Sequence, residues 1–166
     1  MKKLLPIVLI LFILPVFLFA TEIREVGRVE TNRGELYVKS NQSGDVYLDI
    51  MSVSVKFNED EKAELIPALD KAVDFAGKAE RTDITLTKRT GGIKQLTRAN
   101  LAGGVSVYFH TEDGNGRIFL ILKDSADAQF IKAFLSEEQS EKLLSLLKKT
   151  TEKHRSIQDQ LKLFED

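Results

Sequence analysis

An internal repeat constrains the fold of this chain more than any single motif does. The segment 43–50 (SGDVYLDI) returns at 115–122 (NGRIFLIL), with a glycine followed by apolar residues in both copies. A polar residue, an acidic stretch and a helical apolar stripe follow each copy, first at 58–69 and again at 136–147. A sequence pattern that recurs in this way indicates a recurring structural unit. The repeat therefore predicts two equivalent units, although it does not predict their chemistry.

Both helix starts carry the same capping signal. Asn58 precedes Glu61 by three residues, and Ser136 precedes Gln139 by three residues. This spacing lets each pair of side chains satisfy the first free N–H groups of a helix reciprocally. The apolar residues that follow at helical spacing predict the core faces of the two helices: Leu65, Ile66, Leu69 and Val73 in the first, and Leu143, Leu144 and Leu147 in the second.

The segments between turn signals alternate polar and apolar residues, which favours β-strands. The predicted strands are 23–30, 35–40, 45–51 and 53–57 before the first helix, and 83–90, 93–99, 105–110, 117–123 and 129–135 before the second. Gly91-Gly92 predicts a two-residue hairpin turn. The apolar middle of 117–123 predicts a central strand buried on both faces.

These elements predict an α+β fold built from a duplicated ββββα unit. The first unit spans 21–80, and the second spans 81–166 with an extended C-terminal helix. We expect two antiparallel sheets, each packed by the helix of its own unit, within a single compact domain. The absence of cysteine from the whole sequence excludes disulfides, a catalytic thiol and thiolate metal ligands.

The N-terminus has the layout of a bacterial secretory signal. Lys2 and Lys3 precede an apolar run at 4–20, and polar residues follow Ala20. We expect residues 1–20 to be a signal peptide cleaved after Ala20, or, if uncleaved, an N-terminal membrane anchor. Both alternatives export the rest of the chain to the periplasm or beyond the cell. Without this segment the basic count falls from 24 to 22 against 25 acidic residues, which leaves a net charge of −3.

The sequence contains no credible catalytic or metal-binding set, and it implies no cofactor. Ser106 and His110 lie on one face of a predicted strand, but four residues of strand span roughly 13 Å, too far for a hydrogen bond. His154 lacks the His-x-x-x-His spacing of a helical metal site. An enzyme that uses Ser106, His110 and a distant carboxylate remains the least favoured of three functional hypotheses.

A basic strip in the second unit provides a candidate binding site. No acidic residue occurs from 84 to 111. The candidate ligand-binding residues of this stretch are Lys88, Arg89, Lys94, Arg98, Tyr108 and His110. Such a strip suits a phosphate, an acidic glycan or a single-stranded nucleic acid. Alternatively, the cations protect a sheet edge against aggregation.

The C-terminal segment continues its apolar stripe in a heptad-like spacing to Ile157, Leu161 and Phe164. These three residues predict a homodimer contact. The alternative is one long helix whose first half packs on the sheet while its second half frays or folds back.

Two tandem units of four strands and a helix resemble the PUR and Whirly group of repeats. The resemblance lies in 44–50 and the capped helix after Phe57, and again in 116–122 and 136–147. It implies a curved sheet crossed by a helix in each unit, and, for that family, single-stranded nucleic acid bound on basic, aromatic sheet faces. We take from it the expectation of the fold and not of the function.

The favoured hypothesis is a non-enzymatic exported envelope protein, a binding or structural module of unknown ligand. The alternative is a nucleic-acid or anionic-ligand binder that uses the basic strip.

Overall fold

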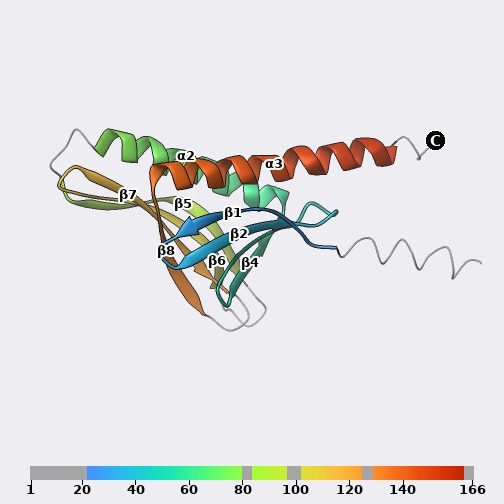
Figure 1. The fold of residues 1–166 in the computed structure, drawn as a ribbon, viewed down its shortest axis with the longest axis horizontal. Coiled ribbons are helices and arrows are strands. Elements are labelled where there is room, and N and C mark those ends of the chain that lie inside the picture. The colour runs from blue at the N-terminus through green and yellow to red at the C-terminus, as the bar shows by residue number, and fades with distance from the viewer. Residues whose placement is uncertain (1–21, 80–83, 97–101, 125–128, 163–166) are drawn as a thin grey trace, which may run out of the picture.

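The computed structural model describes residues 22–79, 84–96, 102–124 and 129–162 of the chain. These residues form an α+β fold with two four-stranded antiparallel sheets and two helices (Figure 1). Both sheets are meanders in which neighbouring strands follow one another in sequence, in the orders β1-β2-β3-β4 and β5-β6-β7-β8. The elements are β1 (Arg24–Thr31), β2 (Gly34–Ser40), β3 (Val46–Ile50), β4 (Val53–Phe57), α2 (Glu59–Ala79), β5 (Leu86–Leu96), β6 (Ala102–Glu112), β7 (Asn115–Lys123), β8 (Phe130–Leu135) and α3 (Glu137–Lys162).

Both predicted capping boxes are present. The backbone N–H of Glu61 donates to Asn58 Oδ1, and the backbone N–H of Asn58 donates to Glu61 Oε2, both at 2.9 Å. Ser136 and Gln139 repeat this exchange at 3.1 and 2.8 Å. Because a capping box satisfies orphan N–H groups and fixes the first turn, both helices begin at the residues that the sequence predicted.

Each helix packs mainly on the sheet of the other unit, which corrects the expectation that it packs on its own. Helix α2 lies across β5, β6 and β7, and α3 lies mainly against β1 and β2 and alongside α2 (Figure 1). Glycines in the receiving strands make room for the helices. A Cβ at Gly27 in β1 would lie 2.6 Å from the side chain of Leu146, and one at Gly91 in β5 would lie 2.7 Å from Ala68. The missing side chains therefore let each helix approach the opposite sheet closely.

The core is one continuous cluster that joins both sheets and both helices. Leu65 and Leu69 of α2 are fully buried, as are Leu143 and Leu147 of α3, and Leu144 is 6% exposed. Ile66 and Val73 are partly buried against this cluster. The residues predicted for the core are therefore correct, although most of the strands that α2 covers belong to the second unit.

The Gly91-Gly92 pair is not a hairpin turn, contrary to prediction. Strand β5 runs straight through both glycines, with a bulge between Arg89 and Gly91, and pairs with β6 over its whole length. A Cβ at Gly92 would lie 2.1 Å from the carbonyl oxygen of Val105, and the φ of Gly92 is 131°. The glycines thus allow a close approach between strand and helix and between two strands, and the antiparallel pairing of β5 with β6 continues past them to Leu96 opposite Ala102.

Helix α3 is one continuous helix from Glu137 to Lys162, so its second half does not fold back onto the sheet as the alternative prediction had it. Its last turns project past both sheets at the end of the molecule where β1 begins (Figure 1). His154 packs near the β2–β3 turn, where a Cβ at Gly44 would lie 2.9 Å from its ring. The predicted dimer residues are not tested, because Phe164 and the side chains of Ile157 and Leu161 lie outside the described part of the chain.

Candidate ligand-binding face

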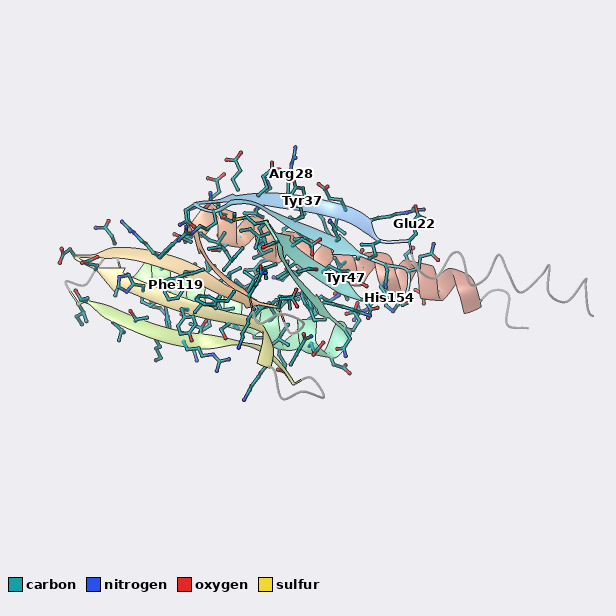
Figure 2. The ribbon with its side chains drawn as sticks, turned by 90° about the horizontal axis from the view of Figure 1, so that it is seen from below. Glu22, Arg28, Tyr37, Tyr47, Phe119 and His154 are labelled. Carbon is teal, nitrogen blue, oxygen red and sulfur yellow. The ribbon has the colours of Figure 1, made fainter. Side chains whose placement is uncertain are left out.

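The strand register of the second sheet (β5–β8) separates its side chains into two faces. Val105, Val107 and Phe109 of β6 are buried toward α2 and the core. Tyr108 and His110 alternate with them and therefore lie on the face away from α2. We call this the outer face of the second sheet. In Figure 2, which views the molecule from the side of the sheets, the labelled Phe119 lies over this sheet.

The predicted basic strip is divided between the two faces. Arg89 pairs in register with Tyr108 on the outer face, and Lys94, opposite Gly104, lies on the same face. Lys88 lies on the other face, where its Nζ is 5.0 Å from the ring centroid of Phe75 in α2. The predicted site residue Arg98 lies outside the described residues. The structure thus brings Arg89, Lys94, Tyr108 and His110 onto one surface and separates Lys88 from them.

Three aromatic rings form a row across the outer face. Tyr108 of β6 and Phe119 of β7 are stacked, with ring centroids 4.9 Å apart and an angle of 4° between the ring planes. Phe134 of β8 follows Phe119 at 5.5 Å. The Nζ of Lys132 lies 3.9 Å from the centroid of Phe119 and 4.8 Å from that of Phe134. Phe119 is only 5% exposed as a result.

Basic side chains surround this aromatic row. The outer-face positions of the described strands carry five cations: Arg89 and Lys94 in β5, Arg117 and Lys123 in β7, and Lys132 in β8. Within the described part of the chain none of them forms an ion pair. The one carboxylate among these outer-face positions is Glu112, at the end of β6. The face therefore combines positive charge with aromatic surface.

His110 takes part in local contacts and not in a catalytic pair. Its Nδ1 shares a hydrogen bond with the hydroxyl of Thr87 at 2.8 Å, and its Nε2 lies 4.0 Å from Glu112. Ser106 lies four residues away on the same extended strand, so its hydroxyl stands roughly 13 Å from His110. Across the described residues no group of three acidic or histidine side chains is placed to hold a metal ion.

The outer face of the first sheet (β1–β4) carries charges of both signs that pair with one another. Lys39 pairs with Asp49 at 2.7 Å, and Lys56 pairs with Asp45 at the same distance. Asp49 also accepts a hydrogen bond from Ser54 at 2.6 Å. The hydrogen bond that Lys39 donates to Asp49 and the negative charge of Asp49 raise the pKa of Lys39. Asp45 raises the pKa of Lys56 in the same way, despite partial burial. The cations of this face are thus already committed to internal partners.

Sequence reasoning missed the part of the second face that comes from β7 and β8. The alternation of Arg117, Phe119, Ile121 and Lys123 was available as a signal. Because 117–123 was interpreted as a strand buried on both faces, its alternate residues were not assigned to an exposed face. The strand is central, between β6 and β8. On the outer side, however, the rings of Tyr108 and Phe134 and the Lys132 side chain cover Phe119, and neither helix packs there.

Comparison with known proteins gives no match to this chain from family models, curated proteins or solved structures. The resemblance to PUR and Whirly repeats therefore stays a prediction. No helix in the described residues has both the length and the apolar character needed to span a membrane. The predicted signal or anchor at 1–20 lies outside those residues.

Proposed function

We propose that this protein is a non-enzymatic, exported binding module whose outer face of the second sheet holds a flexible polyanion. The observation that carries the proposal is the Tyr108–Phe119–Phe134 row set among five cations that have no ion-pair partner among the described residues. Cations that are not paired internally are available to replace the counterions of a polyanion. On the outer face of the first sheet, by contrast, Lys39 and Lys56 are already paired with carboxylates.

Single-stranded nucleic acid is the polyanion that best matches this surface. Such ligands bind where a positive groove follows the backbone and aromatic side chains stack on the bases. Phe119 itself offers little ring surface, because Tyr108 covers one side and Lys132 the other. Phe130, which pairs in register with Lys123 on this face, is 67% exposed and offers its ring to solvent. Tyr108 and Phe130 are therefore the proposed stacking positions.

Export rests on the N-terminal sequence alone. The apolar run at 4–20 after Lys2 and Lys3 supports a secretory signal. Intact-mass measurement of the protein isolated from an expressing bacterium checks this part of the proposal. A mass that corresponds to residues 21–166, found in the periplasmic fraction, is the expected result. A full-length mass in the cytoplasm contradicts export.

Fluorescence anisotropy with a labelled oligothymidylate tests the binding face. We expect binding at low salt that weakens with a log–log slope of about −3, since four or so phosphate contacts on a single strand give roughly this value. The triple variant Arg89→Glu, Arg117→Glu and Lys132→Glu should lose at least about 100-fold in affinity. The matched control reverses three exposed helix lysines, Lys71, Lys142 and Lys149, and makes the same change in net charge. Equal losses in both triple variants, or no binding by the unaltered protein, contradict the proposal.

A comparison of oligothymidylate with inorganic polyphosphate separates the contribution of the rings to binding from that of the charges. The variant Phe130→Ser should weaken oligothymidylate binding by about 1–3 kcal/mol, the cost of losing one stacked base. Its affinity for inorganic polyphosphate, which has no bases, should not change. If a sulfated or uronic-acid glycan binds more tightly than the oligonucleotide, the ligand is a glycan and the assignment to nucleic acid is wrong.

A further inference from the structure

The path of α2 across the second sheet leaves part of that sheet uncovered. A Cβ at Gly91, in the edge strand β5, would lie 2.7 Å from Ala68 in the first half of the helix. A Cβ at Gly116, in β7, would lie 2.9 Å from Ala76 in its second half. The helix therefore runs diagonally from the edge strand toward β7. In the strand register, Gly116 is level with Thr111 and Leu86, so at this level α2 has moved away from β5.

A groove of about 250 Å³ occupies the space that α2 leaves open. Phe75 and Ala79 line it from the helix, and Ile84, Leu86 and Phe109 line it from the sheet. Phe75 and Phe109 meet edge to face with centroids 5.8 Å apart. Ile84 and Leu86 expose 61% and 45% of their surfaces. Water-exposed apolar walls over an aromatic contact are typical of a site for an apolar ligand.

Three polar side chains also line the groove, and two of them, Lys88 and Thr111, have no hydrogen-bond or ion-pair partner among the described residues. The hydroxyl of Thr111 is buried and has no hydrogen-bond partner in the described structure, and the residue is 3% exposed. A buried hydroxyl without a partner carries a free-energy cost that a bound polar group would remove. Lys88 forms no ion pair with a described carboxylate, whereas Lys78 is paired with Asp74. The free positive charge and the free hydroxyl together favour an anionic group.

Lys88 and Thr111 are close enough to meet one ligand group. In the register, Lys88 is opposite Phe109 and Thr111 is opposite Leu86, so the two residues are diagonal neighbours on one face. Diagonal neighbours across an antiparallel pair lie roughly 7–8 Å apart, which long side chains can bridge. A carboxylate between them can accept from the ammonium group of Lys88 and from the Thr111 hydroxyl.

We propose that this groove binds a small amphipathic carboxylate, with its apolar body against Phe75, Leu86 and Phe109 and its carboxylate at Lys88 and Thr111. The groove volume lies just below the range of about 300–1,000 Å³ that is usual for drug-sized ligands, so a medium-chain fatty acid fits the class. The site lies on the α2 side of the second sheet and is independent of the proposed outer-face function. Figure 1 places the end of α2 away from the start of β1 and the end of α3.

Isothermal titration calorimetry with decanoate tests the site in the protein as isolated from expressing cells. We expect decanoate to bind, decan-1-ol to bind roughly tenfold more weakly, and decyltrimethylammonium not to bind, because a charge-assisted hydrogen bond contributes about a factor of ten or more. The variant Lys88→Gln should reduce decanoate affinity to that of the alcohol. Lys71→Gln is the matched control, since Lys71 lies 5.9 Å from the same Phe75 ring but does not line the groove.

Thr111→Val gives a second measure that does not depend on Lys88. It removes the unpaired hydroxyl with little change in volume, so the variant should fold at least as stably and should bind decanoate several-fold more weakly. Oligothymidylate affinity should stay unchanged in Lys88→Gln and Thr111→Val, which keeps this test separate from that of the outer face. Absence of decanoate binding, equal binding of the cationic analogue, or an unaltered affinity in Lys88→Gln would each overturn the proposal.

Discussion

The two sheets share their strand order but differ in what their outer faces do with charge. On the first sheet, Lys39 and Lys56 each lie 2.7 Å from a carboxylate. Tyr37 donates a short hydrogen bond to Glu35, which also pairs with Arg28. On the second sheet, five cations lie beside a row of three rings and have no ion pair among the described residues. Two sheets of the same strand order thus carry one outer face whose cations pair with carboxylates of the same sheet and one whose cations are left for an external partner.

Gly34 of the first sheet and Gly92 of the second are required for different reasons. Gly34 opens β2 with a φ of 110°, and a Cβ there would meet no atom within 4 Å. Gly92 lies inside β5, where a Cβ would lie 2.1 Å from a backbone oxygen of β6. In the first case only the backbone angle requires glycine, whereas in the second both the angle and the space require it.

Alanine at these two positions gives the largest expected difference between the sheets. Gly92→Ala should destabilise the protein by at least about 3 kcal/mol, because backbone strain and a backbone collision add together. Gly34→Ala should cost about 1–2 kcal/mol from the backbone angle alone. Urea denaturation of both variants measures the two values. Equal costs would show that the close approach of β5 and β6 is not limiting.

Removing the carboxylates that pair with Lys39 and Lys56 should leave unpaired cations on the outer face of the first sheet, as on that of the second. The double variant Asp45→Asn and Asp49→Asn releases Lys56 and Lys39, and it should cost about 1 kcal/mol in stability, as expected for two partly exposed ion pairs. It should also raise the affinity for labelled oligothymidylate several-fold at low salt. The matched control, Asp70→Asn and Asp74→Asn, releases lysines on the helices instead. An equal rise in affinity in the control would mean that net charge alone, and not the face, decides binding.

The smallest expected effect is a pH dependence that belongs to the first sheet. Hydrogen bonds with Asp49 and Asp45 raise the pKa values of Lys39 and Lys56 above their ordinary value of 10.5. The stability from these pairs is therefore fully present below pH 10.5 and is lost as the pH rises through the higher pKa values of the folded state. The stability gap between the unaltered protein and the Asp45→Asn and Asp49→Asn variant should be constant from about pH 7 to 9 and should narrow above pH 10.5. A gap that stays constant into strongly alkaline solution contradicts this assignment.

Local signals predicted most of the secondary structure. The alternation before Phe57 and the capping residues Asn58 and Ser136 placed the first four strands and both helix starts. The Gly91-Gly92 prediction failed because the turn propensity of a glycine pair is local, whereas its use here depends on Ala68 and Val105, which are distant in sequence. The packing of each helix on the opposite sheet was not predicted for the same reason. The apolar stripe of a helix is a local feature and does not specify the sheet on which the helix packs.

The candidate face was predictable only in part. The cluster of Arg89, Lys94, Tyr108 and His110 follows from two neighbouring strands, and alternation places these residues on one surface. The addition of Phe119, Phe134 and Lys132 requires the pairing of β7 with β6 and β8, which composition does not reveal. The sequence groups Lys88 with the other cations because the absence of acidic residues is a property of neighbouring positions in sequence. It does not show that Lys88 lies on the α2 side of the sheet.

The packing of α2 and α3 on opposite sheets has a consequence for how the protein folds. Neither half of the chain can complete its interior alone. Helix α2, whose Leu65 and Leu69 are fully buried, packs mainly on β5, β6 and β7 of the other half, and Leu146 of α3 packs against β1. The contacts that complete the core join residues far apart in sequence. They can therefore form only after most of the chain has been brought together during folding. A polypeptide with a single copy of the unit would reach the same closed state only by pairing with a second molecule and trading helices with it.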